Sequence, residues 1–180
     1  LAAAALIAPQ AAQAQEAAAP AAERQPGQTY IRAVHGDWEQ RCVAGAPGAT
    51  REACQLYQLL LDEAGNPVAE VSLFALARPQ GLAVAGATII VPLETLLTEE
   101  LRMAVDGGDT RVYPYQWCSA EGCYARIGLT PEEIAAFRAG SEAQLAIVPA
   151  AAPDQIVGLS VSLSGFTAGY RALEDELAKE

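Results

Sequence analysis

Histidine is almost absent from this 180-residue sequence, because His35 is the only one. A catalytic triad or a facial metal site needs an imidazole oriented by fixed partners, and Asp37 is its only candidate partner nearby in the sequence. The G-x-S-x-G, P-loop, G-x-G-x-x-G and H-E-x-x-H patterns are also missing. We therefore expect a protein that is not an enzyme, has no cofactor or metal, and carries His35 as a partly buried residue at a strand end.

Basic residues are scarce, with 11 Lys and Arg against 22 Asp and Glu, a net charge of −11 and a pI of about 4.5. No basic cluster offsets this charge locally, which argues against nucleic acid and anionic lipid as partners. The pairs Glu99/Glu100 and Asp106/Asp109 do not have EF-hand spacing, and Asp-Gly-Gly-Asp is first a turn signal. A glycosidase-type pair of carboxylates can be neither located nor excluded among so many acidic residues.

The N-terminal segment is apolar and rich in alanine. Leu1–Ala8 has no charge, and Ala12-Gln13-Ala14 forms an A-x-A site before Gln15. We interpret residues 1–14 as a signal peptide remnant; a disordered tail or an uncleaved anchor remains open. The apolar run is too short to span a bilayer. Residues 15–28 lack large apolar side chains and are expected to be a flexible linker before one domain over residues 29–180.

Only four cysteines are present, arranged as the near pairs Cys42/Cys54 and Cys118/Cys123. Four cysteines allow three disulfide connectivities; loop closure favours the two local bridges but does not exclude the crossed ones. A four-cysteine zinc site is the rival interpretation, and neither spacing is the C-x2-C of most structural zinc sites. Export into an oxidising compartment favours structural disulfides.

Short segments with alternating apolar and polar residues dominate the chain and predict strands. Two strands are expected around the Gly36-Asp37 turn. Further strands are expected at 54–61, 68–76, 82–91 (with a bulge or bend at Gly86), 101–105, 110–115, 124–129, 145–149 and 156–163. Residues 92–100 could form a loop or a helical turn. The predicted fold is mainly β, an antiparallel β-sandwich or barrel-like domain.

Two helices are expected beside these strands. Thr130, Pro131 and Glu133 form a T-P-x-E capping box that predicts a short helix at about 130–139. A helical stripe that begins at Phe166 and includes Tyr170 predicts a second helix at the C-terminus.

Aromatic residues are few but gather around the second cysteine pair, at Tyr113, Tyr115, Trp117 and Tyr124. If exposed, these side chains would form an interaction surface. The alternative is that some of them pack on the bridge and into the core.

Several short motifs together resemble the invasion-associated locus B family: Gly36-Asp37-Trp38 with Cys42, Cys54-Gln55, Cys118 with Glu121-Gly122-Cys123, and Ser160–Ala168. The resemblance implies a bacterial periplasmic or outer-envelope protein with a β-sandwich-like fold and paired cysteines. It offers no established catalytic residue, and a role in invasion is not carried over. Residues 92–100 depart from the family by being more acidic and poorer in glycine.

We therefore expect a non-enzymatic, exported, periplasmic envelope protein that acts through protein–protein or surface interaction. One alternative is a periplasmic binder of a small ligand or carbohydrate, gripped by the aromatic residues. Another is an accessory periplasmic subunit of a membrane complex, which would touch the membrane only through an uncleaved N-terminal segment.

Overall fold

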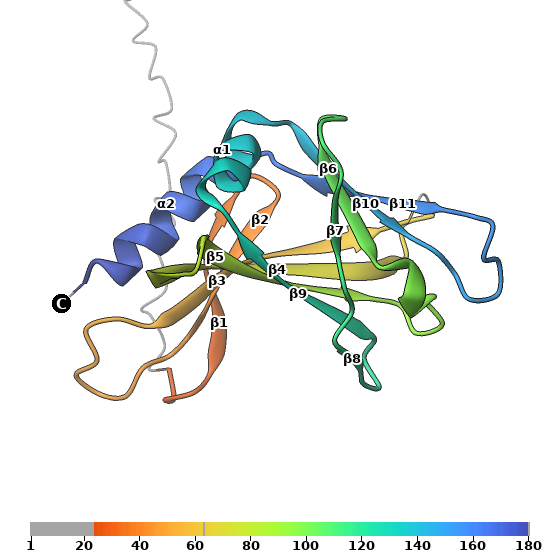
Figure 1. Cartoon of the computed structure of the whole chain (residues 1–180). Helices are drawn as coiled ribbons and strands as arrows, with labels where there is room; N and C mark the ends of the chain where they lie inside the picture. The colour runs from red at the N-terminus through yellow and green to blue at the C-terminus, as the bar shows by residue number, and fades with distance from the viewer. Residues whose placement is uncertain (1–23, 63, 180) are drawn as a thin grey trace, which may run out of the picture.

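The computed structural model describes residues 24–62 and 64–179 (Figure 1). The predicted signal peptide remnant and residues 15–23 of the predicted linker lie outside these residues. The last part of the linker is paired with the sheet, because Gly27 donates to the Ala44 carbonyl and Ala44 donates to that of Gln28. The ordered pairing therefore begins before Thr29.

Within the described residues, eleven antiparallel strands form two sheets. The seven-stranded sheet has the order β1 (Thr29–His35), β2 (Trp38–Val43), β3 (Ala53–Leu61), β4 (Pro67–Gln80), β5 (Ala83–Val91), β9 (Cys123–Leu129), β8 (Trp117–Cys118). The four-stranded sheet has the order β11 (Val157–Ser162), β10 (Glu142–Ile147), β6 (Leu101–Val105), β7 (Arg111–Tyr113). Neither sheet closes on itself within the described residues, so the fold is a sandwich and not a barrel.

The two sheets share one hydrophobic core. Alternate residues of β4 and β5, such as Leu73 and Ile89, are buried from one side, and Leu145 and Val161 from the other sheet join the same cluster. This alternation follows from the two-residue period of a strand, which sends successive side chains to opposite faces. The mainly β fold with two helices is confirmed.

The helices close one end of the sandwich. The helix α1 (Pro131–Ala139) begins with the predicted capping box, in which Thr130 and Glu133 bond each other's backbone N–H groups. The helix α2 (Phe166–Leu177) packs on β3 and β4. Its first residue, Phe166, is fully buried between the rings of Trp38 and Phe137.

Three details differ from the sequence-based expectations. The strand β4 continues to Gln80, and the two-residue strand β8 was not expected. The predicted bulge at Gly86 is wrong, because Gly86 pairs regularly with Phe74 and Gly128. The ring of Phe74 lies where a Cβ at position 86 would be, which explains a glycine without a bulge. Between β5 and β6, residues 97–99 form the short 3-10 helix η1 (Leu97–Glu99), which is the helical turn expected as one of the two alternatives for residues 92–100.

Candidate interaction site

Among the residues that the structure describes, the His35 ring contacts Gln40 and not Asp37. Its Nε2 lies 3.3 Å from the side-chain oxygen of Gln40. The carboxylate of Asp37, the one candidate partner in the sequence, instead accepts a hydrogen bond of 2.5 Å from Ser162 Oγ. His35 and Asp37 therefore do not form the dyad that base catalysis requires.

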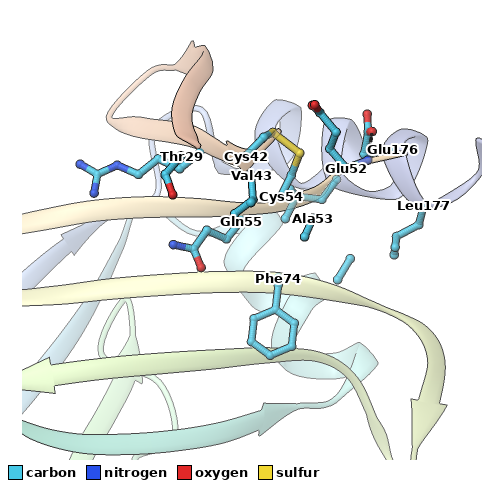
Figure 2. Close-up of a pocket in the computed structure, with 13 residues that line it drawn as sticks. Thr29, Cys42, Val43, Glu52, Ala53, Cys54, Gln55, Phe74, Glu176 and Leu177 are labelled. Atoms are coloured by element: carbon cyan, nitrogen blue, oxygen red, sulfur yellow. Dashed lines mark hydrogen bonds between the residues drawn. A yellow bond between two sulfur atoms is a disulfide. The ribbon is translucent and has the colours of Figure 1, made fainter. Parts of the chain in front are cut away.

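The structure brings together two carboxylates that the sequence did not single out. Glu52, which precedes β3, and Glu176 of α2 line a cavity of about 370 Å³ beside the Cys42–Cys54 bridge (Figure 2). The Glu52 N–H donates to Glu176 Oε1 at 2.8 Å, and Arg32 pairs with both carboxylates. These contacts hold the C-terminal helix against the strand β1 and the start of β3.

Both carboxylates are held in the ionised form. Tyr30 donates a hydrogen bond to Glu52, which, with the Arg32 charge, lowers the pKa of Glu52. Burial opposes ionisation of Glu176, but hydrogen bonds from Lys179 and from the Glu52 N–H, with the Arg32 charge, still lower its pKa. A carboxylate pair in general acid–base catalysis needs one partner that keeps its proton near neutral pH. The arrangement of Glu52 and Glu176 is that of an ionic clamp.

Residues 24–62 and 64–179 hold neither a cluster of metal ligands nor a membrane-spanning helix. This part of the chain contains no group of three or more His, Cys, Asp or Glu side chains placed to bind a metal ion. Within the same part, no helix is long and apolar enough to cross a bilayer.

The cysteines form the two local bridges that loop closure favours. Cys42 and Cys54 lie directly opposite each other on β2 and β3, and Cys42 is buried. Cys118 and Cys123 join β8 to β9 across a short turn. Opposed positions on neighbouring antiparallel strands bring the two Cβ atoms within the reach of a disulfide.

The four aromatic residues expected as an interaction surface separate into two pairs. Tyr113 and Tyr115 pack against the core. Tyr113 donates a 2.7 Å hydrogen bond to Glu133 of α1, and burial together with this bond raises its pKa well above the usual range. Burial raises the pKa of Tyr115 to about 12. Both tyrosines are partly buried, as the alternative of packing into the core expects.

Trp117 and Tyr124 form the second pair, in which Trp117 is exposed and Tyr124 is partly buried. Their rings stack with centroids 4.9 Å apart and an interplanar angle of 12°. The Trp117 side chain is 43% exposed, and the neighbouring Cys118–Cys123 bridge fixes the turn that carries it. Trp117 is thus the exposed member of the four aromatic residues, and an interaction role for it stays a prediction.

The residues that carry the family resemblance near Gly36 and Gly165 form a structural junction. The turn between β1 and β2 touches the segment between β11 and α2, and Asp37 N–H donates to the Ser164 carbonyl at 3.1 Å. Gly36 and Gly165 both have positive φ, and a Cβ on either would collide with the backbone of the facing segment. Only glycine permits this close approach.

Gln58 completes the junction from inside the sandwich. Its amide donates to the Asp37 and Ser162 carbonyls, and its oxygen accepts from Ser162 N–H at 2.8 Å. Trp38 Nε1 donates to the same Ser162 carbonyl at 2.8 Å. Gln58 is 7% exposed, and its amide nitrogen and oxygen both form hydrogen bonds, as a buried polar side chain requires.

A groove of about 930 Å³ is lined by the β3–β4 hairpin, the segment after β5 and the β10–β11 hairpin. These three segments lie at the end of the sandwich away from the helices (Figure 1). Four large apolar side chains in its lining are exposed, namely Leu61, Leu93, Ile156 and Val157. Sequence reasoning missed this groove, because its residues come from three segments that only the fold brings together.

Comparison with known proteins points to one family. The family model described as Invasion associated locus B (IalB) protein matches residues 38–174. A solved structure, the crystal structure of invasion associated protein b from Bartonella henselae, matches with a TM-score of 0.67 and 24% identity. The match covers 82% of this chain and 95% of that chain, and shows a shared fold. No curated protein matches this sequence.

Proposed function

We propose that this chain, which belongs to the invasion associated locus B family, is a non-enzymatic, exported envelope protein. It acts by binding another protein. The observation that carries this proposal is the apolar groove at the end of the sandwich. Ile156 is 64% exposed and Leu93 is 50% exposed there, beside Leu61 and Val157. Contiguous exposed apolar side chains of this kind mark interaction sites on soluble proteins.

Export is supported by the two disulfides and by the A-x-A site in the sequence. Disulfides form and persist in the bacterial periplasm and other oxidising compartments, whereas cytosolic thiols are kept reduced. The periplasm is the compartment that we propose.

A non-enzymatic role is supported by the use that the fold makes of its reactive side chains. His35 bonds to Gln40, Asp37 bonds to Ser162, and Glu52 and Glu176 share the charge of Arg32. Each of these groups is occupied by a contact that stabilises the fold.

Capture of the partner tests the proposal. Purified protein on a solid support is incubated with envelope extract of the bacterium that produces it, and co-eluting proteins are identified by mass spectrometry. The groove variant carries Leu93→Asp and Ile156→Asp; the control carries Leu82→Asp, at a residue that is 82% exposed in the β4–β5 turn, outside the groove.

We expect one stoichiometric protein to be retained by the wild type and by the Leu82 variant, and to be lost from the groove variant. All three substituted side chains are at least half exposed, so circular dichroism should show the same fold in each protein. Equal retention by the groove variant would refute the groove as the binding site.

A carbohydrate-binding role is the second candidate, and the stacked Trp117–Tyr124 pair favours it, because the exposed indole face of Trp117 is available to a sugar ring. A glycan array distinguishes the two roles. Specific glycan binding that Trp117→Ala abolishes would support the carbohydrate role and count against the protein-binding proposal.

A further inference from the structure

The edge of β11 shows how the groove could hold its partner. β11 pairs with β10 on one side only, so its other side is an edge of the four-stranded sheet. In an antiparallel pair, the N–H and C=O groups of alternate residues point away from the paired strand. Ser162 is one such residue, because its N–H and its carbonyl both bond to Gln58.

Gln58 therefore occupies the place of a neighbouring strand at one end of the β11 edge. The next residues with the same orientation are Ser160 and Gly158, two and four positions before Ser162. No described residue donates to or accepts from the backbone of either one in the structure's hydrogen bonds. Both residues line the apolar groove. The edge of β11 is thus bonded to the other sheet at Ser162, through Gln58, and borders the groove from Ser160 to Ile156.

We propose that the groove binds an extended segment of a partner protein, which pairs as an added strand with the free edge of β11. This inference rests on the proposed function and specifies how its partner binds. Ser160 and Gly158 supply the N–H and C=O groups for main-chain hydrogen bonds, over about 7 Å at 3.3 Å per residue. Alternate apolar side chains of the segment contact Leu93, Ile156 and Val157, as in other cases of strand addition.

The charge of the groove specifies the partner further. Its described lining includes the carboxylates of Asp62 and Glu94 and no basic side chain. The whole chain carries a net charge of −11. The bound segment is therefore apolar at alternate positions and carries Lys or Arg beside the apolar core, because such charges complement the rim and speed association.

A second copy of this chain fits the groove less well. Two β11 edges facing each other would bring Asp62 and Glu94 of both copies together, and both molecules carry the same negative charge. Like charges brought together at an interface cost free energy. The occupant that we propose is a different protein.

The test uses a library of random seven-residue peptides displayed on phage and selected against the purified protein. Selected peptides are synthesised and titrated against three proteins, namely the wild type, Ser160→Pro and Ser160→Thr. Proline removes the outward N–H of Ser160, and the exposed side of an edge strand tolerates it. Threonine changes the side chain and keeps the N–H. Hydrogen exchange of Gly158 and Ser160 amides is followed with and without peptide.

We expect peptides with alternating apolar residues and flanking Lys or Arg, slowed exchange at both amides, and weaker binding as salt rises. Ser160→Pro should weaken binding by roughly tenfold, because it removes one main-chain hydrogen bond and adds a ring at the edge. Ser160→Thr should weaken binding by less. Equal binding by both variants, unprotected amides, peptides without basic residues, or a dimer that Ser160→Pro dissociates would each overturn the proposal. If Ser160→Pro does not fold, amide protection in the wild type decides.

Failure of this inference is distinguishable from failure of the proposed function. If envelope capture depends on Leu93 and Ile156 while the Gly158 and Ser160 amides stay unprotected by the captured partner, the protein-binding function holds and strand pairing is wrong. If capture is also independent of the groove, both are wrong.

Discussion

Replacing Gln58 with methionine tests whether its buried amide holds the two sheets together where it bonds to Ser162 of β11. The side chains have similar length and volume, so the change removes hydrogen bonds without opening a cavity. Ser162 N–H loses its bond to Gln58 Oε1, and the Asp37 and Ser162 carbonyls lose theirs to Nε2. The Ser162 carbonyl keeps its 2.8 Å bond from Trp38 Nε1.

The expected loss in the free energy of unfolding follows from these lost hydrogen bonds. A buried N–H left without a partner costs about 1–3 kcal/mol, and each lost amide–carbonyl bond costs about 0.5–1.5 kcal/mol. Because Trp38 still serves one of the two carbonyls, we expect Gln58→Met to lower the free energy of unfolding by about 2–4 kcal/mol. For a domain of this size that is a fall in Tm of roughly 5–15 °C.

Urea unfolding followed by tryptophan fluorescence measures the change, with Gln144→Met as the matched control. Gln144 is exposed on β10 and bonds only to Glu142 through its side chain, so its replacement should cost less than about 0.5 kcal/mol. A loss below about 1 kcal/mol for Gln58→Met, or equal losses for the two variants, would refute the role assigned to Gln58.

Three further predictions concern the clamp, the bridges and the histidine. Glu176→Gln should lower stability by about 1–2 kcal/mol at pH 7. Because the folded pKa of Glu176 is lowered, its contribution to stability is complete above the unfolded pKa of about 4.3 and is lost as pH falls through the folded value. The gap between wild type and variant in urea titrations should therefore narrow as pH falls below about 4.3; a constant gap would contradict the clamp. Cys42→Ser should lower Tm more than Cys118→Ser, because the Cys42–Cys54 bridge closes a loop of 12 residues and contributes about 3 kcal/mol, whereas the Cys118–Cys123 bridge closes 5 and contributes about 2 kcal/mol. Calorimetry that gave the reverse order would contradict this ranking. Non-reducing peptide maps check the pairing. His35→Ala should leave partner capture unchanged, and its loss in a folded variant would argue for a functional histidine.

Much of the fold could be predicted because its signals are local. The two-residue alternation in 157–162 and the capping box at Thr130 act within a few residues of the chain, so the strand and the helix follow from sequence. Strand β8 escaped prediction, since two residues carry no period. Gly86 was misinterpreted because the ring that explains it belongs to Phe74, on the neighbouring strand.

The candidate interaction site, unlike the fold, depends on contacts between residues that are distant in the sequence. Of the four aromatic residues expected at this surface, Trp117 is exposed and stacks on the partly buried Tyr124, whereas Tyr113 and Tyr115 pack against the core. All four lie within one short stretch of sequence, and side-chain direction in the folded chain separates them. Burial depends on which sheet or helix faces each ring, and residues such as Glu133 that decide it lie elsewhere in the chain.

By itself, the sequence determined the family, the mainly β class and the capped helix, because these depend on residue order and short-range spacing. Only the tertiary structure decided where β11 is paired and where it is free. The hydrogen bond between Gln58 and Ser162 joins residues that are 104 positions apart in the sequence. Leu93 and Ile156 are also distant in the sequence and line the same groove only because the chain folds. A sheet edge and a groove are relations between distant segments, and the free energy that places those segments comes from the common core, which no local pattern specifies.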